Sequence, residues 1–450
     1  MALSWRAVVA AGFGVVWAVL WPTPVVVISW FLVVALGCGI DFALAASPHR
    51  IGVGRQPMGA VRRFAPTSTK LVVVNESGRR LRGLIRDAWP PSAVGLTKNE
   101  LVASARHIVE LPDGDRMLLA SPIQPNRRGD LAAGPVTIRS YGPMRLAARQ
   151  TTVAVPGRIR VLPEFASRKH LPSRLARLQE LDGRAAVQVR GEGTEFDNLR
   201  AYVAGDDVRS IDWRASARMA TDPNLVVRTW RPERDRQVLI VLDTGRTAAM
   251  RLGQSDDSGP MAATGEPRLD SEIEAALLLA TLADRAGDRV CVLAYDLQLQ
   301  AMVVRASGQK LLSRLADTLA GVSANLVETN WPGLVALVRR LAPHRALVVI
   351  LTAMEPAVIK SQLLPVIGSL AARHQVLIAS ATDPAAAQLA TERGAETIYD
   401  AAAANRMELA RQATAQQLRS RGVLVLTAPA PELAPAVADE YIRLKAARLL

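Results

Sequence analysis

The densest group of residues able to do chemistry lies between residues 191 and 218, where acids, bases and single aromatic side chains alternate. Charges at this density cannot be buried unpaired, and the two signs are too evenly mixed for a repelling tail. We therefore expect carboxylate–guanidinium pairs around the aromatic rings. Such a network either fixes a loop or binds a partner, and the residues expected in it are Glu195, Phe196, Arg200, Tyr202, Asp206, Asp207, Arg209, Asp212, Trp213 and Arg218.

The same stretch closely resembles the signature of the DUF58 family, G-x-EF-x-x-LR-x-Y-x-x-GDD-x-R-x-IDW-x-x-SAR. The resemblance implies a bacterial protein with two membrane helices, a β-rich segment, the signature and a von Willebrand factor A-like domain, in that order. It also implies a partner, a MoxR-type AAA+ ATPase that helps to assemble or remodel other complexes, often at the cell envelope.

A second candidate site is the run Asp243-Thr-Gly-Arg-Thr247, which follows a predicted buried strand and is similar to the Asp-x-Ser-x-Ser start of a metal-ion-dependent adhesion site. Carboxylate and hydroxyl oxygens suit Mg²⁺, and the resemblance assigns Asp243, Thr247 and Thr329 as ligands. Two expected ligands are missing, because Gly245 replaces the first serine and Ala353 stands where the pattern has an aspartate. We therefore expect a weak site or none, with Asp243 capping backbone amides at the end of its strand.

No enzyme motif is present with supporting spacing: the chain contains no GxxxxGK[ST], HExxH or GxSxG pattern. Its five histidines are scattered, and its two cysteines are too few for a disulfide framework or a cysteine-rich metal site. We predict a binding protein and not an enzyme. We expect no cofactor, and Mg²⁺ at the degraded site is kept as an alternative.

Two apolar stretches, residues 5–21 and 25–46, lie ahead of these sites and are separated by Pro22-Thr-Pro24. Each is about long enough to span a bilayer, and the prolines end the first helix. Four of the eight tryptophans fall here, which is typical of a lipid interface. Basic residues flank the outer ends, which predicts a two-pass plasma-membrane protein with both termini and the soluble domains in the cytoplasm: Arg6, His49, Arg50, Arg55, Arg62 and Arg63.

The elements that must position the candidate sites follow from periodicity. Short alternating apolar runs between residues 61 and 161 predict a small antiparallel β-sandwich. After residue 234, nearly continuous apolar strands alternate with amphipathic helices, as in a mainly parallel sheet covered on both faces. The fold class is therefore α/β, with two transmembrane helices, a β-sandwich and a doubly wound sheet of von Willebrand factor A type by resemblance. We predict a hairpin at 1–50, the β-sandwich at 51–170, a connector and signature at 171–234, and the α/β domain at 235–450.

The net charge of +14 is compatible with nucleic acid, anionic lipid or an acidic protein as a partner. Aromatic residues make up only 4% of the chain and no nucleic-acid-binding motif is found, so no nucleic acid partner is expected. The prediction is a membrane-anchored cytoplasmic binding or scaffold protein. The alternatives are a divalent-metal-dependent adhesion module, or a binder of anionic lipid or nucleic acid through a basic surface.

Overall fold

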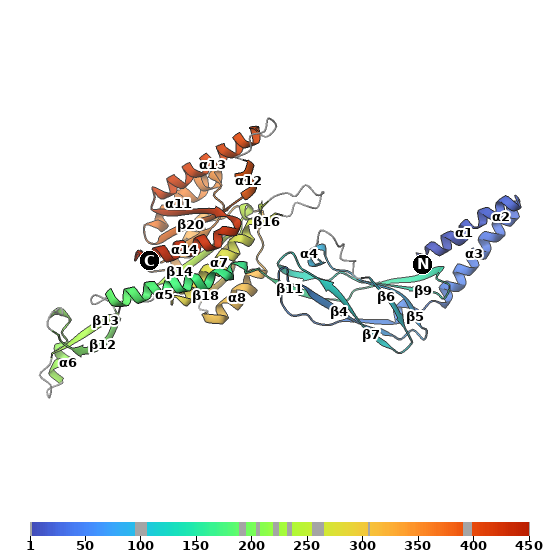
Figure 1. Ribbon diagram of the computed structural model, residues 1–450, viewed down its shortest axis with the longest axis horizontal. Coiled ribbons are helices and arrows are strands. Elements are labelled where there is room, and N and C mark those ends of the chain that lie inside the picture. The colour runs from blue at the N-terminus through green and yellow to red at the C-terminus, as the bar shows by residue number, and fades with distance from the viewer. Residues whose placement is uncertain are drawn as a thin grey trace. The chain divides into compact units, whose positions relative to one another are not determined.

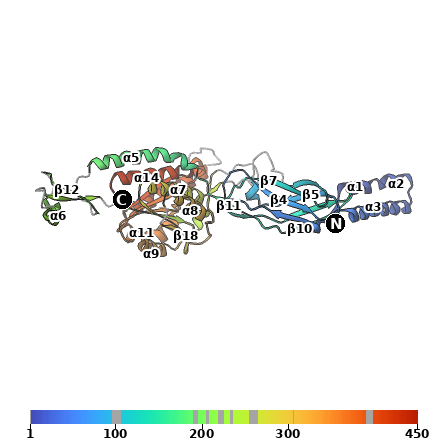
Figure 2. The ribbon, with the colours of Figure 1, turned by 90° about the horizontal axis from the view of Figure 1, so that it is seen from below.

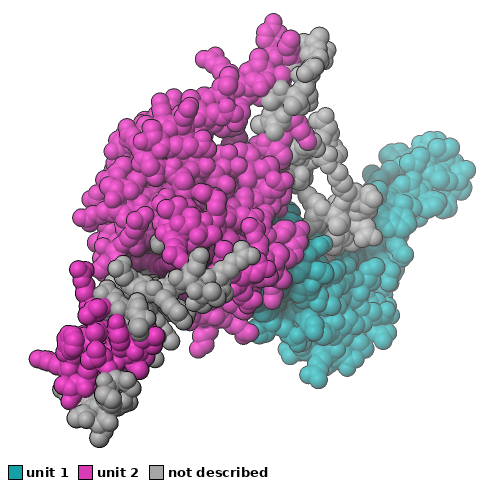
Figure 3. Space-filling view, turned by 60° about the vertical axis from the view of Figure 1, so that its left-hand side comes forward, with its two compact units in different colours: residues 1–164 teal, residues 165–450 magenta. Residues whose placement is uncertain are grey.

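The computed structural model describes residues 2–94, 106–188, 195–203, 208–218, 225–231, 236–253, 265–304, 307–389 and 398–449. It divides into two compact units, residues 1–164 and 165–450, which are coloured separately in Figure 3. The apolar hairpin and the β-rich segment share the first unit. The finer boundaries after residues 50, 170 and 234 remain predictions.

The first unit begins with an apolar helical hairpin. Helices α1 (Trp5–Gly12) and α2 (Gly14–Leu20) are separated at Phe13, and α3 (Pro24–Leu44) returns antiparallel to them (Figure 1). By length and composition α3 could cross a membrane, whereas α1 and α2 together are a shorter apolar segment. The sequence had predicted two spans of similar length.

Close packing of Trp30 holds the two legs of the hairpin together. Its indole nitrogen donates to the Ala10 carbonyl at 3.0 Å, and its ring lies 6.1 Å from that of Trp17, at an angle of 36° between the two planes. A Cβ at Gly14 would lie 2.6 Å from the Trp30 ring, so this contact requires glycine there. Most of the other large apolar side chains of the hairpin are exposed.

The rest of the first unit is built from three antiparallel or mixed sheets. A five-stranded sheet has the order β1 (Ala2–Leu3), β10 (Ala147–Val153), β9 (Val136–Tyr141), β5 (Leu81–Asp87) and β6 (Arg106–Leu111). A three-stranded sheet contains β2 (Ile51–Arg55), β4 (Thr67–Asn75) and β7 (Arg116–Ile123). Alternate residues of both sheets form one core, as expected for a sandwich. The third sheet joins β3 (Val61–Arg62), β11 (Arg158–Leu162) and β8 (Gly129–Ala132), and α4 (Pro91–Val94) is a single short turn.

Asp41 fastens the hairpin to the sandwich. It lies in the last turn of α3, is fully buried, and accepts from the backbone amides of Met144 at 2.8 Å, Leu146 at 2.7 Å and Ala147 at 2.9 Å. At the other end of the hairpin, β1 pairs with β10 in the register Ala2↔Ala148. Both ends are therefore held by the same β9–β10 hairpin.

The second unit contains a six-stranded sheet in the order β18 (Leu299–Val304), β17 (Arg289–Tyr295), β14 (Gln237–Asp243), β19 (Leu347–Leu351), β20 (Gln375–Thr382) and β21 (Val423–Pro429). Five strands are parallel and β18 is an antiparallel edge strand, which the sequence analysis did not predict. The strand order reverses between β14 and β19, and in open sheets ligands bind at such a switch point, beside the carboxyl ends of the strands.

Helices cover both faces of this sheet (Figures 1 and 2). One core lies under α5 (Leu171–Gln188), α7 (Arg268–Arg285), α8 (Gly308–Ala320) and α14 (Ala430–Ala446). The other lies under α9 (Trp331–Leu341), α11 (Leu364–Ala371) and α13 (Ile398–Arg419). Residues 356–371 do not form one regular helix: α10 (Pro356–Val358) is followed by a π-helical turn at Ile359–Leu363 and then by α11.

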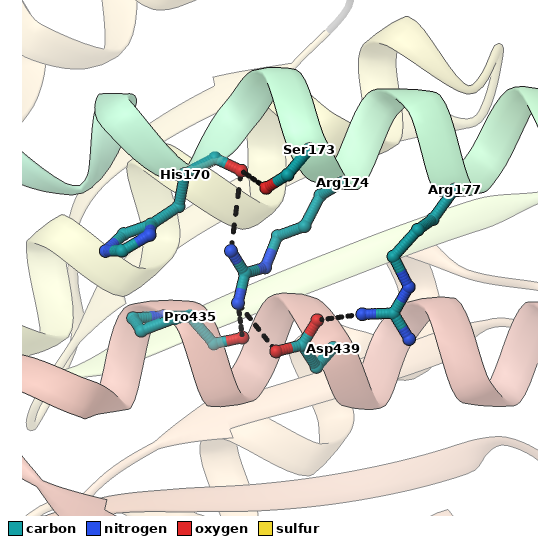
Figure 4. A network of polar contacts seen from close by, with 6 residues as sticks. All are labelled: His170, Ser173, Arg174, Arg177, Pro435 and Asp439. Carbon is teal, nitrogen blue, oxygen red and sulfur yellow. Dashed lines mark hydrogen bonds and ion pairs between the residues drawn. The ribbon is translucent and has the colours of Figure 1, made fainter.

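Helix α5 lies along α14 and is held there by two arginines (Figure 4). Arg174 contacts Asp439 at 2.6 Å and Arg177 contacts the other carboxylate oxygen at 2.9 Å. Beyond α5, β12 (Glu195–Ala201) and β13 (Val226–Arg231) pair only with each other among the described strands, with the 3-10 turn Val208–Ser210 and α6 (Trp213–Arg218) between them. We call β12, β13 and the described residues between them the signature arm.

Candidate functional site

Asp212 organises the signature arm. Its carboxylate accepts from the amides of Arg214 and Ala215 at 3.0 Å each, which caps α6, and from the Arg228 guanidinium at 2.7–2.8 Å. These hydrogen bonds, with the Ala215 amide and then Arg228 as the main donors, lower the pKa of Asp212. A carboxylate–guanidinium pair of the expected kind is therefore present, and its arginine comes from β13, outside the predicted set.

The other predicted residues of the signature are spread along the arm. Glu195, Phe196 and Arg200 lie in β12, the Tyr202 amide donates to the Leu225 carbonyl at 2.7 Å, and Arg209 lies in the 3-10 turn. Arg218 ends α6, and Asp206 and Asp207 lie outside the described residues.

Large apolar side chains of the signature arm are exposed. Trp213 and Val208 are each 62% exposed and Val203 is 61% exposed. The described part of the arm forms a two-stranded sheet of its own, and a two-stranded sheet is at best marginally stable alone in water. Exposed aromatic and aliphatic side chains on such an element are typical of a surface that a partner covers.

The second candidate site lies at the carboxyl edge of the six-stranded sheet, at its switch point. Asp243 ends β14 and is 3% exposed. Its carboxylate accepts from Thr329 Oγ1 at 2.6 Å, Thr352 Oγ1 at 2.6 Å, the Gly245 amide at 2.9 Å and Thr247 Oγ1 at 3.5 Å. Burial raises the pKa of Asp243, and the threonine and amide hydrogen bonds oppose that rise.

This donor set does not fit a divalent metal ion. Hydroxyl protons and one amide already occupy both oxygens of Asp243, and Ala353 has no ligand atom. A Cβ at Gly245 would lie 2.4 Å from Thr329 Oγ1, so Thr329 occupies space that the serine of a metal site would need. No cluster of three or more His, Cys, Asp or Glu suited to a metal occurs in the described part of the chain.

Two charged residues of α7 are buried near Asp243. Glu272 is fully buried, and neither of its carboxylate oxygens has a hydrogen-bond partner among the described residues. Burial raises the pKa of Glu272 well above its usual value; Arg268 opposes the rise and Asp243 adds to it. Arg268 donates to the Thr247 carbonyl at 3.0 Å, and burial lowers its pKa.

A second buried carboxylate, Asp296, follows β17 on the same edge. It accepts from Asn325 Nδ2 at 2.7 Å and from Gln300 Nε2 at 2.8 and 3.0 Å. Burial alone would raise the pKa of Asp296, but the hydrogen bonds from Asn325 and Gln300 lower it overall. The segment between α8 and α9 supplies both Asn325 to Asp296 and Thr329 to Asp243, so one loop closes over both carboxylates.

Comparison with known proteins identifies the family. The sequence profile described as "Protein of unknown function DUF58" matches residues 198–422, which is half of the chain. This chain belongs to the DUF58 family. The match begins within β12 and ends directly before β21. It includes Asp212, Arg228 and Asp243, whereas Glu195 and Phe196 precede it.

No curated protein matches the DUF58 chain. Among solved structures, it is similar to the PilB minor pilin from Streptococcus sanguinis, with 9% identity over 81% of this chain and 88% of that one and a TM-score of 0.34. A PapD-like domain of human CEP192 has 9% identity and a TM-score of 0.17, and covers 25% of this chain and 85% of that one. Scores this low do not indicate a shared fold.

Two of the site residues outside the predicted set, Asp296 and Thr352, share a position in the chain that could have been recognised. Asp296 and Thr352 each directly follow a strand of the parallel sheet, where polar side chains gather at one edge. This position in the sequence would have been enough to predict both residues as candidates for the site. Asn325 and Gln300 have no comparable signal. The folded loop after α8 brings Asn325 to Asp296, and the turn between β17 and β18 brings Gln300 there.

Proposed function

We propose that this DUF58 chain is a membrane-anchored cytoplasmic binding or scaffold protein. The exposed apolar surface of α1, α2 and α3 supports insertion of the whole hairpin into a bilayer as two spans. Its two ends are fastened to one β-hairpin, so they leave the bilayer on the same side. Arg50 and Arg79 are exposed near that end, which favours the cytoplasmic face.

The signature arm carries the binding role. The single observation behind this is the exposure of Trp213, Val208 and Val203, which lie between the two strands of the signature arm. Tryptophan and arginine are enriched among the residues that dominate protein interfaces, and Arg228 pairs with Asp212, the residue that precedes Trp213. We infer a protein partner that covers this arm.

The partner that we propose is a MoxR-type AAA+ ATPase, by resemblance to the DUF58 family. The second unit has a mainly parallel sheet with one antiparallel edge strand and helices on both faces, which suits a von Willebrand factor A-like domain. In this proposal the chain acts by binding and not as an enzyme. The proposal includes no metal cofactor, because protein donors satisfy Asp243. A metal-dependent adhesion module is less well supported for the same reason.

The test is co-purification of the full-length chain in nanodiscs with a MoxR-type ATPase from the same cell, with ATP and Mg²⁺. We expect Trp213→Ala to reduce recovery of the ATPase at least tenfold, since a central aromatic anchor contributes about 2 kcal/mol or more. Tyr399→Ala is the matched control, because Tyr399 is an 83% exposed aromatic residue on α13.

Equal recovery with Trp213→Ala and with the unmodified chain would exclude the arm as the binding surface. If the unmodified chain recovers no AAA+ ATPase, the partner proposal is wrong. Equal losses with Trp213→Ala and Tyr399→Ala would point to nonspecific adhesion of exposed aromatic residues.

A further inference from the structure

A polar pocket of about 320 Å³ opens on the carboxyl edge of the six-stranded sheet, beside Asp296. Its lining comes from β18, the end of α8 and the segment that follows α8: Gln300, Ala301, Thr318, Gly321, Val322, Ser323 and Asn325. Gln300, Gly321 and Ser323 are exposed, so the pocket is accessible from solvent. No predicted signature residue lines this pocket, and neither Asp243 nor any residue that donates a hydrogen bond to it does so.

The side chains of this pocket present hydrogen-bond acceptors. An ionised carboxylate can only accept, so the amide nitrogens of Gln300 and Asn325 must face Asp296. Their carbonyl oxygens are then turned away from Asp296, and no donor among the described residues reaches them. The hydroxyls of Thr318 and Ser323 add further acceptors.

The electrostatic potential around the pocket is negative, like the partial charges of these acceptor oxygens. Helix α8 ends at Ala320, and a helix C-terminus carries a partial negative charge. Asp296 is a buried anion next to the pocket, and no lysine or arginine is among the described lining residues. In a chain of net charge +14, this pocket is therefore a local site that favours a cation with several donors.

Exposed leucines flank the pocket. Leu297 follows Asp296 and is 55% exposed, Leu299 precedes Gln300 and is 39% exposed, and Leu326 follows Asn325 and is 83% exposed. Because Asp296 binds both Gln300 and Asn325, the chain segments that carry these leucines meet at Asp296. A polar pocket with an apolar rim suits a peptide segment better than a free metabolite.

We propose that this pocket binds the guanidinium of an arginine presented by a protein partner, with the leucines contacting apolar residues beside that arginine. Guanidinium has five donors in a planar fork, which matches several fixed acceptors better than a single ammonium does. The inference rests on the proposed binding role, and it adds a second contact surface on the sheet edge.

The test uses the full-length chain in nanodiscs, without any ATPase, and three capped tripeptides: acetyl-Leu-Arg-Leu-amide, the citrulline analogue and the lysine analogue. Citrulline has nearly the shape of arginine without its charge. Calorimetric titration should show the arginine peptide binding at least tenfold more tightly than the citrulline peptide, and more tightly than the lysine peptide. Equal affinity for all three would overturn the proposal, and tighter binding of free arginine than of the peptide would replace it with a metabolite site.

Three lysine variants test whether the arginine peptide binds in this pocket. Thr318→Lys places an ammonium group in the pocket and should abolish binding of the arginine peptide, with Ser323→Lys as a second blocking variant at the pocket mouth. Ser313→Lys adds the same charge at an exposed position of α8 and should leave binding unchanged. Loss of binding in the Ser313 control would overturn the assignment. Since no ATPase is present, a failed co-purification and a failed peptide titration are separate results.

Discussion

Asp41 and Asp243 are both buried aspartates at the end of a regular element, and each is satisfied entirely by protein donors, yet the donors differ. Asp41 accepts from three backbone amides, whereas Asp243 accepts from one amide and three threonine hydroxyls. Backbone amides are present whatever the sequence, so the Asp41 contact depends on one side chain only. The Asp243 site can be altered one hydroxyl at a time. The first arrangement is a structural clasp, and the second is a tunable site.

The largest expected effect is at the clasp. Asp41→Ala leaves three amides of the 144–147 segment without their acceptor, and we expect a loss of about 3–5 kcal/mol in the stability of the first unit. Denaturant unfolding of the full-length chain in detergent measures it. Asp130→Ala is the control, because Asp130 forms only a partly exposed pair with Arg160 at 3.5 Å and should change stability by about 1 kcal/mol or less. Similar losses for the two variants would contradict the clasp.

An intermediate effect is expected at the tunable site. Gly245→Ala should destabilise the second unit by about 1–3 kcal/mol, because the new Cβ meets Thr329 Oγ1. Adding Thr329→Ala should relieve most of that penalty, so the two changes should be clearly non-additive in a double-mutant cycle. Gly368→Ala is the matched control: nothing lies within 4 Å of its Cβ position in α11, and alanine should be neutral or stabilising there. Strict additivity of the Gly245 and Thr329 changes would show that they do not share space.

The smallest effect concerns Glu272 beneath this site, and it depends on pH. Because burial raises the pKa of Glu272, its contribution to stability is complete below the unfolded pKa and is lost as the pH rises toward the folded pKa. Glu272→Gln removes this dependence, so the variant should gain about 1 kcal/mol relative to the unmodified chain between pH 5 and pH 6. Unfolding midpoints at a series of pH values measure the gain. If the difference in stability between Glu272→Gln and the unmodified chain does not change with pH, the assignment is contradicted.

The periodicity of the sequence was sufficient for the mixed α/β class, because long apolar runs such as those of β14 and β19 can only be buried on both faces. It was insufficient for β18, whose sequence Leu-Gln-Ala-Met-Val-Val is short and only weakly alternating. The π-helical turn at Ile359–Leu363 was also not predictable, since it depends on packing and not on helix propensity.

Site residues could be predicted from the sequence only where they stand at the carboxyl end of a strand, as Asp243 does. Arg228 lies in an ordinary apolar-polar alternation, and only strand pairing brings it to Asp212. The loss of the metal-site pattern at Gly245 was visible in the sequence. That Thr329 fills the vacated space required the three-dimensional structure.

The pairing of Ala2 with Ala148 also has a consequence for biosynthesis. During translation, α1, α2 and α3 leave the ribosome about one hundred residues before β10 does. The hairpin, with its exposed apolar side chains, is therefore complete before β10 can bind it. Its contacts with the sandwich form afterwards. A nascent chain arrested before residue 144 would carry the complete hairpin without either of the contacts that hold it.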